Sequence, residues 1–288
     1  MDFLREKALP AVSRNSCAQG AEAQVIQGPH PLGADAKPAR RTFNALNGAD
    51  GATEPRLLIM ISVEMQSRAE HRWPAVIGLL AALGLYGTLP TTFLPGVRYV
   101  VVVVGLGLLI PLVVLNPRRL TRETRWSRIL SIGQALLLVV ANEAALVQLV
   151  IALTTTNSNG PTLLLAALQV WVTNVIAFAL VYWELDRGGP VSRRHTPRPH
   201  LPRADFRFPQ DEDHDAVKEV AARSSVKTGW TAAFIDYLYF SLSNSMAFSP
   251  TDTMPLSARA KGLMGLEAFG GFVLLALVIA HAVSLLGQ

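Results

Sequence analysis

Charge and cysteine are both scarce in this sequence. Lys, Arg, Asp and Glu together make up 16% of the 288 residues, whereas an average soluble domain carries about 25%. The single cysteine, Cys17, cannot form an intramolecular disulfide, and no group of Cys and His has the spacing of a metal site. Apolar residues account for 50% of the chain. This composition excludes a disulfide-stapled or zinc-binding soluble domain and favours a membrane protein.

The motifs of common enzymes are absent as well. The sequence holds no phosphate-binding Gly-rich loop, no GxSxG, no HExxH and no paired Cys motif. We therefore expect no enzyme activity, no catalytic residues, no metal site and no cofactor. A signal peptide is not expected either, because the short apolar run Leu57–Val63 lies far from the N-terminus and lacks a small-residue cleavage site.

Long apolar runs dominate what is present. A helix needs about 20 apolar residues to cross a bilayer. Five runs meet that requirement, at Trp73–Leu89, Arg98–Leu115, Ile129–Leu153, Thr162–Trp183 and Gly262–Leu286. The shorter segment Trp230–Phe248 is just long enough to cross. The predicted fold is all-α, a polytopic transmembrane helical bundle of five spans plus one pore-helix-like segment, or of six spans if that segment crosses.

Basic residues gather between the apolar runs. The stretch Pro117–Arg128 holds five Arg against one Glu, and the N-terminal arm and the segment after the fourth span are also rich in Arg. The links after the first and third spans carry no charge. By the positive-inside rule, this distribution predicts a multi-pass plasma-membrane protein with a cytoplasmic N-terminus. The Arg118–Arg128 cluster predicts contact with anionic lipid headgroups and not with nucleic acid.

Composition divides the chain into four segments. Residues 1–70 show no persistent helical or strand period and predict a disordered arm, unless the natural start is Met60 or Met65. The remaining segments are a four-span membrane bundle at 71–186, a polar cytoplasmic loop at 187–228, and a pore-like segment with the last span at 229–288.

Several polar residues lie within the apolar runs. Glu143, beside Asn142, is near the middle of the third span, where an ionisable group costs roughly 2.5 kcal/mol or more. It is either a site on an ion or proton path or a hydrogen-bonded Glu that holds helices together. Glu267 lies one turn into the last span, near an interface. Uncharged polar residues on the third and fourth spans favour hydrogen bonds between the two helices: Gln134, Gln148, Gln169, Thr173 and Asn174.

The C-terminal segment has a recognisable order. An aromatic segment, a polar stretch with Pro and Asp, and a Gly- and Ala-rich helix follow one another in residues 230–286. The chain resembles here the pore half of the two-span potassium-channel family, through Tyr239-Phe240-Ser241 in the pore helix, Asp252 and Pro255 after the filter, and Leu266-Glu267-Ala268 in the inner helix. The resemblance implies a pore helix within Trp230–Phe248 and a hinge at Gly270 and Gly271.

The filter positions differ from that family. Those equivalent to its TVGYG are Ala247, Phe248, Ser249, Pro250 and Thr251. A potassium filter needs stacked backbone carbonyls whose angles glycine permits, while Pro250 fixes φ and removes a donor. The resemblance therefore implies a shared re-entrant architecture without potassium selectivity.

A second resemblance covers about three quarters of the chain. It is carried by four runs, NPRRLTRE (Asn116–Glu123), WELDRGGP (Trp183–Pro190), FRFPQ (Phe206–Gln210) and AFSPTDTMPL (Ala247–Leu256). By these runs the chain resembles a family of uncharacterised bacterial polytopic membrane proteins. That family implies no particular activity.

Three functions are compatible with these features. The first is a channel-like or transport-like protein whose pathway is lined by Asp236, Asn244 and Asp252, with Glu143 nearby. Conduction would imply a homo-oligomer, because channel-type pores are commonly built by symmetric assemblies. The alternative is a non-conducting membrane scaffold or assembly protein. A membrane-embedded lipid enzyme ranks third, because no nucleophile and base can be paired.

Overall fold

A computed structural model describes most of the chain after residue 69. The described residues are 70–90, 95–115, 120, 124–155, 160–212, 218–247 and 252–286. They all belong to one compact unit, Arg56–Gln288. The predicted arm at 1–70, apart from Glu70, lies outside the described residues, and so do the filter-equivalent positions Phe248, Ser249, Pro250 and Thr251.

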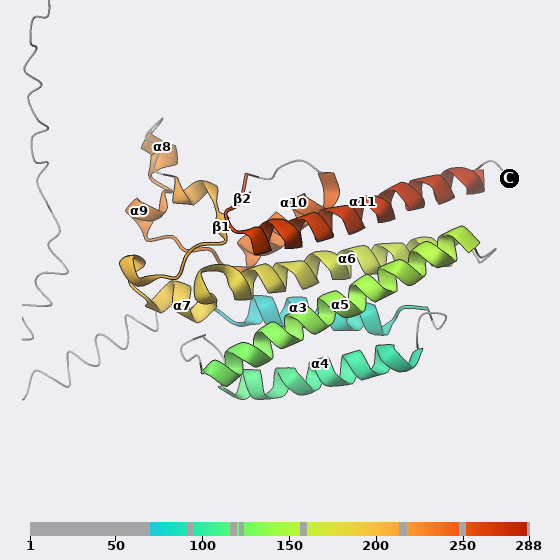
Figure 1. Cartoon of the computed structure of the whole chain (residues 1–288), viewed down its shortest axis with the longest axis horizontal. Coiled ribbons are helices and arrows are strands. Elements are labelled where there is room, and N and C mark those ends of the chain that lie inside the picture. Colours follow the sequence, from blue (N-terminus) through green and yellow to red (C-terminus); the bar gives the residue numbers. More distant parts are fainter. Residues whose placement is uncertain are drawn as a thin grey trace, which may run out of the picture. The chain divides into compact units, whose positions relative to one another are not determined.

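Long apolar helices form the body of the described unit (Figure 1). The helices are α3 (Trp73–Gly87), α4 (Pro95–Leu115), α5 (Arg125–Thr155), α6 (Gly160–Leu185) and α11 (Ala258–Leu286). Among the described residues, α4, α5, α6 and α11 are long and apolar enough to cross a membrane, and α3 is a shorter apolar helix. These four helices indicate a membrane-embedded protein.

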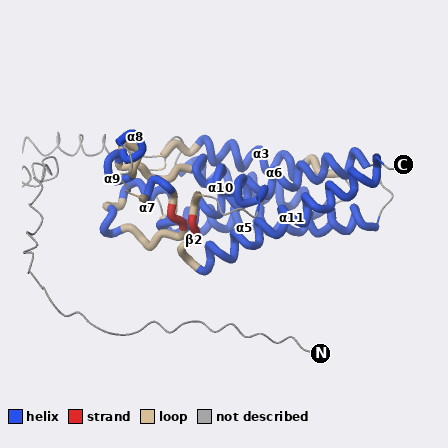
Figure 2. The backbone as a smooth tube through the Cα atoms, turned by 90° about the horizontal axis from the view of Figure 1, so that it is seen from above, coloured by secondary structure: helices blue, strands red, loops and turns tan. Residues whose placement is uncertain are grey.

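Short elements gather at one end of the long helices, opposite the C-terminus (Figure 2). They are η1 (Asp186–Gly188), α7 (Pro190–His195), η2 (Arg198–His200), β1 (Phe206–Arg207), η3 (Pro209–Asp211), α8 (Lys218–Ala221) and α9 (Ser225–Thr228). We call this end the loop end. After α10 (Phe234–Ala247), the chain returns to it as β2 (Met254–Pro255). β2 pairs antiparallel with β1, with Phe206 opposite Pro255.

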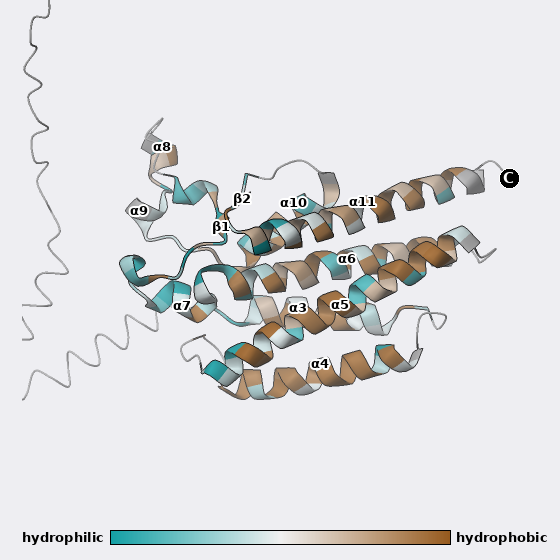
Figure 3. Cartoon of the chain, in the orientation of Figure 1, coloured by the Kyte–Doolittle hydropathy of each residue, from teal (hydrophilic) through white to brown (hydrophobic). Residues whose placement is uncertain are grey.

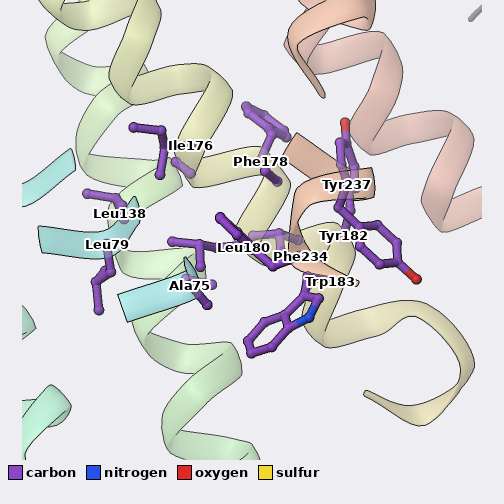
Figure 4. Packing of buried hydrophobic residues seen from close by; sticks show 14 of the residues in the cluster. Ala75, Leu79, Leu138, Ile176, Phe178, Leu180, Tyr182, Trp183, Phe234 and Tyr237 are labelled. Carbon is purple, nitrogen blue, oxygen red and sulfur yellow. The ribbon is translucent and has the colours of Figure 1, made fainter. Parts of the chain in front are cut away.

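The central helix is α6. It buries 61% of its most apolar stretch against its neighbours, compared with 28% for α4 and 22% for α11. Figure 4 shows its residues Phe178, Tyr182 and Trp183 packed with Phe234 and Tyr237 of α10. The ribbons of α4 and α5 are mostly coloured as hydrophobic (Figure 3), and many of their apolar side chains are exposed, as expected for helices that face lipid.

The segment that the sequence left open, Trp230–Phe248, does not run from one end of the bundle to the other. At the start of α10, the Phe234 amide donates to Glu70 at 2.7 Å, beside Trp183 at the loop end. Beyond α10, β2 is again at the loop end, paired with β1. The 14 residues of α10 extend about 21 Å, which is short of the roughly 30 Å of a bilayer core. α10 therefore enters the bundle from the loop end, and the chain returns there.

Candidate functional site: a buried carboxyl cluster

The carboxyl group of Glu267 lies at the centre of a polar cluster between α6, α10 and α11. Its side chain is fully buried. Oε2 accepts hydrogen bonds from the Tyr182 hydroxyl at 2.7 Å and from Asn244 Nδ2 at 2.6 Å, and Oε1 is hydrogen-bonded to the Ser241 hydroxyl. Among the described residues, no Lys, Arg or His forms an ion pair with this carboxyl group.

Ser241 connects this carboxyl group to the backbone of α6. Its Oγ lies 2.8 Å from the carbonyl oxygen of Val175 as well as in hydrogen-bonding contact with Glu267 Oε1. A hydroxyl has a single proton to donate, so it cannot satisfy two acceptors. Both contacts are hydrogen bonds if Glu267 carries a proton and donates it to Ser241, which then donates to Val175. The arrangement therefore fits a protonated Glu267.

A second carboxyl group, that of Glu143 on α5, lies next to the same stretch of α11. A Cβ placed on Gly270 would lie 3.7 Å from Glu143 Oε2, and Gly270 is one turn beyond Glu267. Glu143 Oε1 is buried and has no hydrogen-bond partner among the described residues.

Two asparagines continue the polar cluster across α5 and α6. Asn142 Nδ2 donates to Asn174 Oδ1 at 2.9 Å, and both side chains are almost completely buried. The expected hydrogen bonding between the third and fourth spans is thus present, although Asn142 makes it in place of a glutamine. Two of the glutamines contact other segments, since Gln134 donates to the Gly105 carbonyl and Gln169 donates to the Thr88 hydroxyl.

Of the four pathway residues expected from the sequence, two lie at the carboxyl cluster around Glu267. Asn244 bonds to Glu267, and Glu143 lies beside Gly270. Asp236 is elsewhere, at the start of α10, where its Oδ2 accepts the Ala233 amide at 2.8 Å. Asp252 is exposed between α10 and β2. Asp236 is therefore a helix cap, and neither aspartate contacts the cluster.

The glycines expected to act as a hinge lie at a helix contact. A Cβ on Gly271 would lie 2.5 Å from the backbone oxygen of Ser245 in α10, so only glycine permits this approach. α11 is continuous through both positions. A hinge role for Gly270 and Gly271 stays a prediction. Of the filter-equivalent positions, only Ala247 is described, as the last residue of α10.

A further polar cluster ties the loop end to α10. Asp186 is fully buried. Its Oδ1 accepts the amides of Asp205 and Phe206 at 2.8 and 3.3 Å, and its Oδ2 accepts the Tyr237 hydroxyl at 2.6 Å. Its contact with Arg187 is longer, at 3.8 Å. Asp186 thus connects two of the runs named above, WELDRGGP and FRFPQ, with each other and with α10. The pairing of β1 with β2 connects a third run, AFSPTDTMPL, to the same region.

Glu70 anchors the chain just before α3 to the same region. It accepts hydrogen bonds from the Phe234 amide at 2.7 Å and from Trp183 Nε1 at 3.2 Å. Burial raises the pKa of this carboxyl group, against the opposing effects of the Phe234 hydrogen bond and of the nearby charges on Arg193 and Arg194. Sequence reasoning gave no role to Glu70, which lies outside the apolar runs.

The sequence predicts that Glu267 lies one turn into a span that begins at Gly262. The helix begins at Ala258, and the Ser257 hydroxyl accepts the Ala260 amide at 3.2 Å as a cap. Glu267 is therefore more than two turns into α11. Ser257, a residue type common at the N-cap of helices, is the sequence feature that could have given the start of α11 and hence the position of Glu267 within it.

The chain matches no protein-family model, and no curated protein or solved structure matches it either. Among the described residues, no group of three or more His, Cys, Asp or Glu side chains could hold a metal ion. The chemistry of the site therefore has to be argued from its own residues, and the two resemblances stay predictions.

Proposed function

We propose that this protein is a channel-like or transport-like membrane protein in which Glu267 binds and releases a proton. The observation that carries the proposal is the buried carboxyl group of Glu267, held by three side chains of neighbouring helices. In this proposal α3 is the fifth span, the loop end faces the cytoplasm, and the C-terminus lies outside.

The protonation state of Glu267 determines how much its burial costs. A carboxylate buried without a cationic partner loses its hydration, which costs several kcal/mol. A proton or a bound cation removes that cost. The two contacts of the Ser241 hydroxyl favour a proton on Glu267 over a bound cation. With that proton, Glu267 donates to Ser241 and Ser241 donates to the Val175 carbonyl, which gives one continuous chain of hydrogen bonds.

The surrounding groups suggest a route for the proton. Towards the loop end, Tyr237 lies one turn before Ser241 on α10 and donates to Asp186. Towards the middle of the bundle, Glu143 offers a second acid with an unpartnered oxygen. Ionisable groups inside a membrane commonly mark proton relays. The series Asp186, Tyr237, Glu267 and Glu143 supports a path that reaches from the loop end into the bundle.

Proton flux into proteoliposomes tests this proposal. We expect a pH-sensitive dye inside the vesicles to respond to an imposed gradient with the full-length protein and to lose most of that response with Glu267→Gln. Glu212→Gln is the matched control, because Glu212 is partly exposed in the loop and pairs with Arg207. Vesicles with the unmodified protein that pass no more protons than protein-free vesicles would overturn the proposal.

A non-conducting scaffold is the second candidate. It is favoured by the complete hydrogen bonding of Glu267, which joins α6, α10 and α11 as effectively as a structural network would. This function predicts that Glu267→Gln lowers the stability of the bundle while the unmodified protein carries no flux. The same vesicles and a thermal unfolding measurement distinguish the two.

A further inference from the structure

A pocket rich in arginine lies at the loop end, away from the carboxyl cluster. It encloses about 230 Å³, whereas one water occupies about 30 Å³ in the liquid. The space is therefore large enough for a group of several heavy atoms. Its lining comes from the segment after α6 and from the residues that lead into α10: Arg187, Arg193, Arg198, Leu201, Pro202, Asp211, Trp230 and Thr231.

Arg193 is the most buried of these residues, at 2% exposure. Its Nη1 donates to the carbonyl oxygens of Trp183 and Asp186 at 2.7 and 2.8 Å, and its guanidinium lies over the Tyr237 ring at 4.9 Å. Nε and Nη2 have no hydrogen-bond partner within the described part of the chain. A buried guanidinium with two unused donors is costly unless an acceptor reaches it.

The acidic side chains nearby are already engaged. Arg187 pairs with Asp211, and Asp186 accepts three hydrogen bonds from its neighbours. Among the residues that the structure describes, Arg198 donates only to the Trp230 carbonyl, at 3.2 Å. The lining holds three guanidinium groups and one carboxylate. Glu70 and Asp236 also interact with the charge of Arg193, but neither accepts a hydrogen bond from it, so its Nε and Nη2 stay unused within the described residues.

We propose that this pocket binds a phosphate group. Guanidinium groups match the oxygens of phosphate in geometry and charge, and a phosphate would supply acceptors to the donors that Arg193 leaves unused. The group could belong to an anionic lipid headgroup or to a soluble phosphate, since both present the same oxygens. The proposal is independent of proton binding at Glu267.

Binding of inorganic phosphate to the full-length protein in nanodiscs tests the site. The melting temperature is followed against phosphate concentration in phosphatidylcholine nanodiscs, with chloride at matched ionic strength as the reference. We expect phosphate to raise the melting temperature of the unmodified protein. In Arg198→Gln the apparent Kd should rise about tenfold, since one charge-assisted hydrogen bond is lost.

Arg203→Gln is the matched control. Arg203 is exposed in the same loop and does not line the pocket, so it removes the same charge and should leave the Kd unchanged. Arg198 is exposed and makes one hydrogen bond, so its replacement leaves the fold intact. An equal loss in both variants, or no phosphate effect in the unmodified protein, would overturn the site.

The source of the phosphate group is identified by repeating the titration in nanodiscs that contain phosphatidic acid. If the lipid occupies the pocket, the melting temperature starts higher and added phosphate has no further effect, and Arg198→Gln removes the lipid-dependent increase. If the occupant is a soluble phosphate, the titration is the same in both lipid mixtures. Either result supports a phosphate site.

Discussion

At the scale of single residues, Gly271 sets the distance between α10 and α11. An added Cβ would meet the Ser245 carbonyl oxygen at 2.5 Å, which is closer than any real contact of this kind. The neighbouring atom belongs to the backbone of α10, so it cannot rotate away as a side chain would. The close approach is also what brings Ser241 and Asn244 within hydrogen-bonding reach of Glu267.

Gly271→Ala is therefore expected to destabilise the bundle. Overpacking of this kind costs about 1–3 kcal/mol, which outweighs the gain of up to about 1 kcal/mol that alanine brings to a helix. Thermal unfolding in detergent micelles measures the difference. Gly265→Ala on the same helix is the control, because its Cβ meets nothing within 4 Å, and it should be neutral or slightly stabilising. Equal behaviour of the two variants would contradict the packing described here.

The residues of the carboxyl cluster were only partly foreseeable. Glu143 and Asn244 could be selected from the sequence, because a charge or an amide in an apolar run is costly and needs a partner. Tyr182 and Ser241 carry no such signal, since tyrosine and serine are common in membrane helices. Their contacts with Glu267 join residues 85 and 26 positions apart, and only the packing of α6, α10 and α11 brings them together.

At the scale of elements, α10 is a helix that enters the bundle and does not cross it. Its amphipathic sequence alone could not show this, because nineteen residues from Trp230 to Phe248 are just enough to span. The evidence comes from the start of α10, which Glu70 holds at the loop end, and from β2, which follows α10 and pairs with β1 at the same end. The long apolar helices were easier to predict, because the length and hydropathy of a segment determine whether it can form a membrane-spanning helix.

Cysteine labelling in a Cys17→Ser background tests the path of α10. Arg203→Cys and Asp252→Cys place thiols at exposed positions before and after this helix. We expect both to react with an impermeant reagent from the same side of the membrane. A third cysteine, added after Gln288, serves as the control and should react from the opposite side, since α11 runs away from the loop end. Reaction of the Asp252→Cys thiol from the side opposite to Arg203→Cys would show that the segment crosses.

At the scale of the whole molecule, Asp186 holds distant segments together. Its two oxygens bind the backbone before and within β1 and the Tyr237 side chain of α10. These partners lie 19, 20 and 51 positions further along the chain. Asp205 extends the connection to α11 through Ser257 and Arg259. The loop end is therefore part of the packed bundle and not an independent appendage.

Asp186→Asn should consequently loosen the loop end and α10 together. The asparagine keeps one acceptor oxygen, but its NH₂ group replaces the other and faces a group that now donates a hydrogen bond to Asp186. We therefore expect a loss of about 2–4 kcal/mol of stability. Glu212→Gln is the control, because its pair with Arg207 is partly exposed and contributes only about 0–1 kcal/mol. Thermal unfolding gives the stabilities, and hydrogen exchange locates the change. Exchange that rises in the loop alone, with α10 still protected, would contradict the connection.

The burial of Glu267 has a consequence for the order in which the protein is made. Ser241 and Asn244 of α10 contact a residue that follows them by 26 and 23 positions, on α11, which is synthesised after α10. Until α11 is inserted, Asn244 lacks its acceptors on that helix, and Ser241 has only the Val175 carbonyl of α6. α10 therefore completes its contacts only after α11 has been made, and a nascent chain arrested before Glu267 should still expose α10 to the translocation machinery.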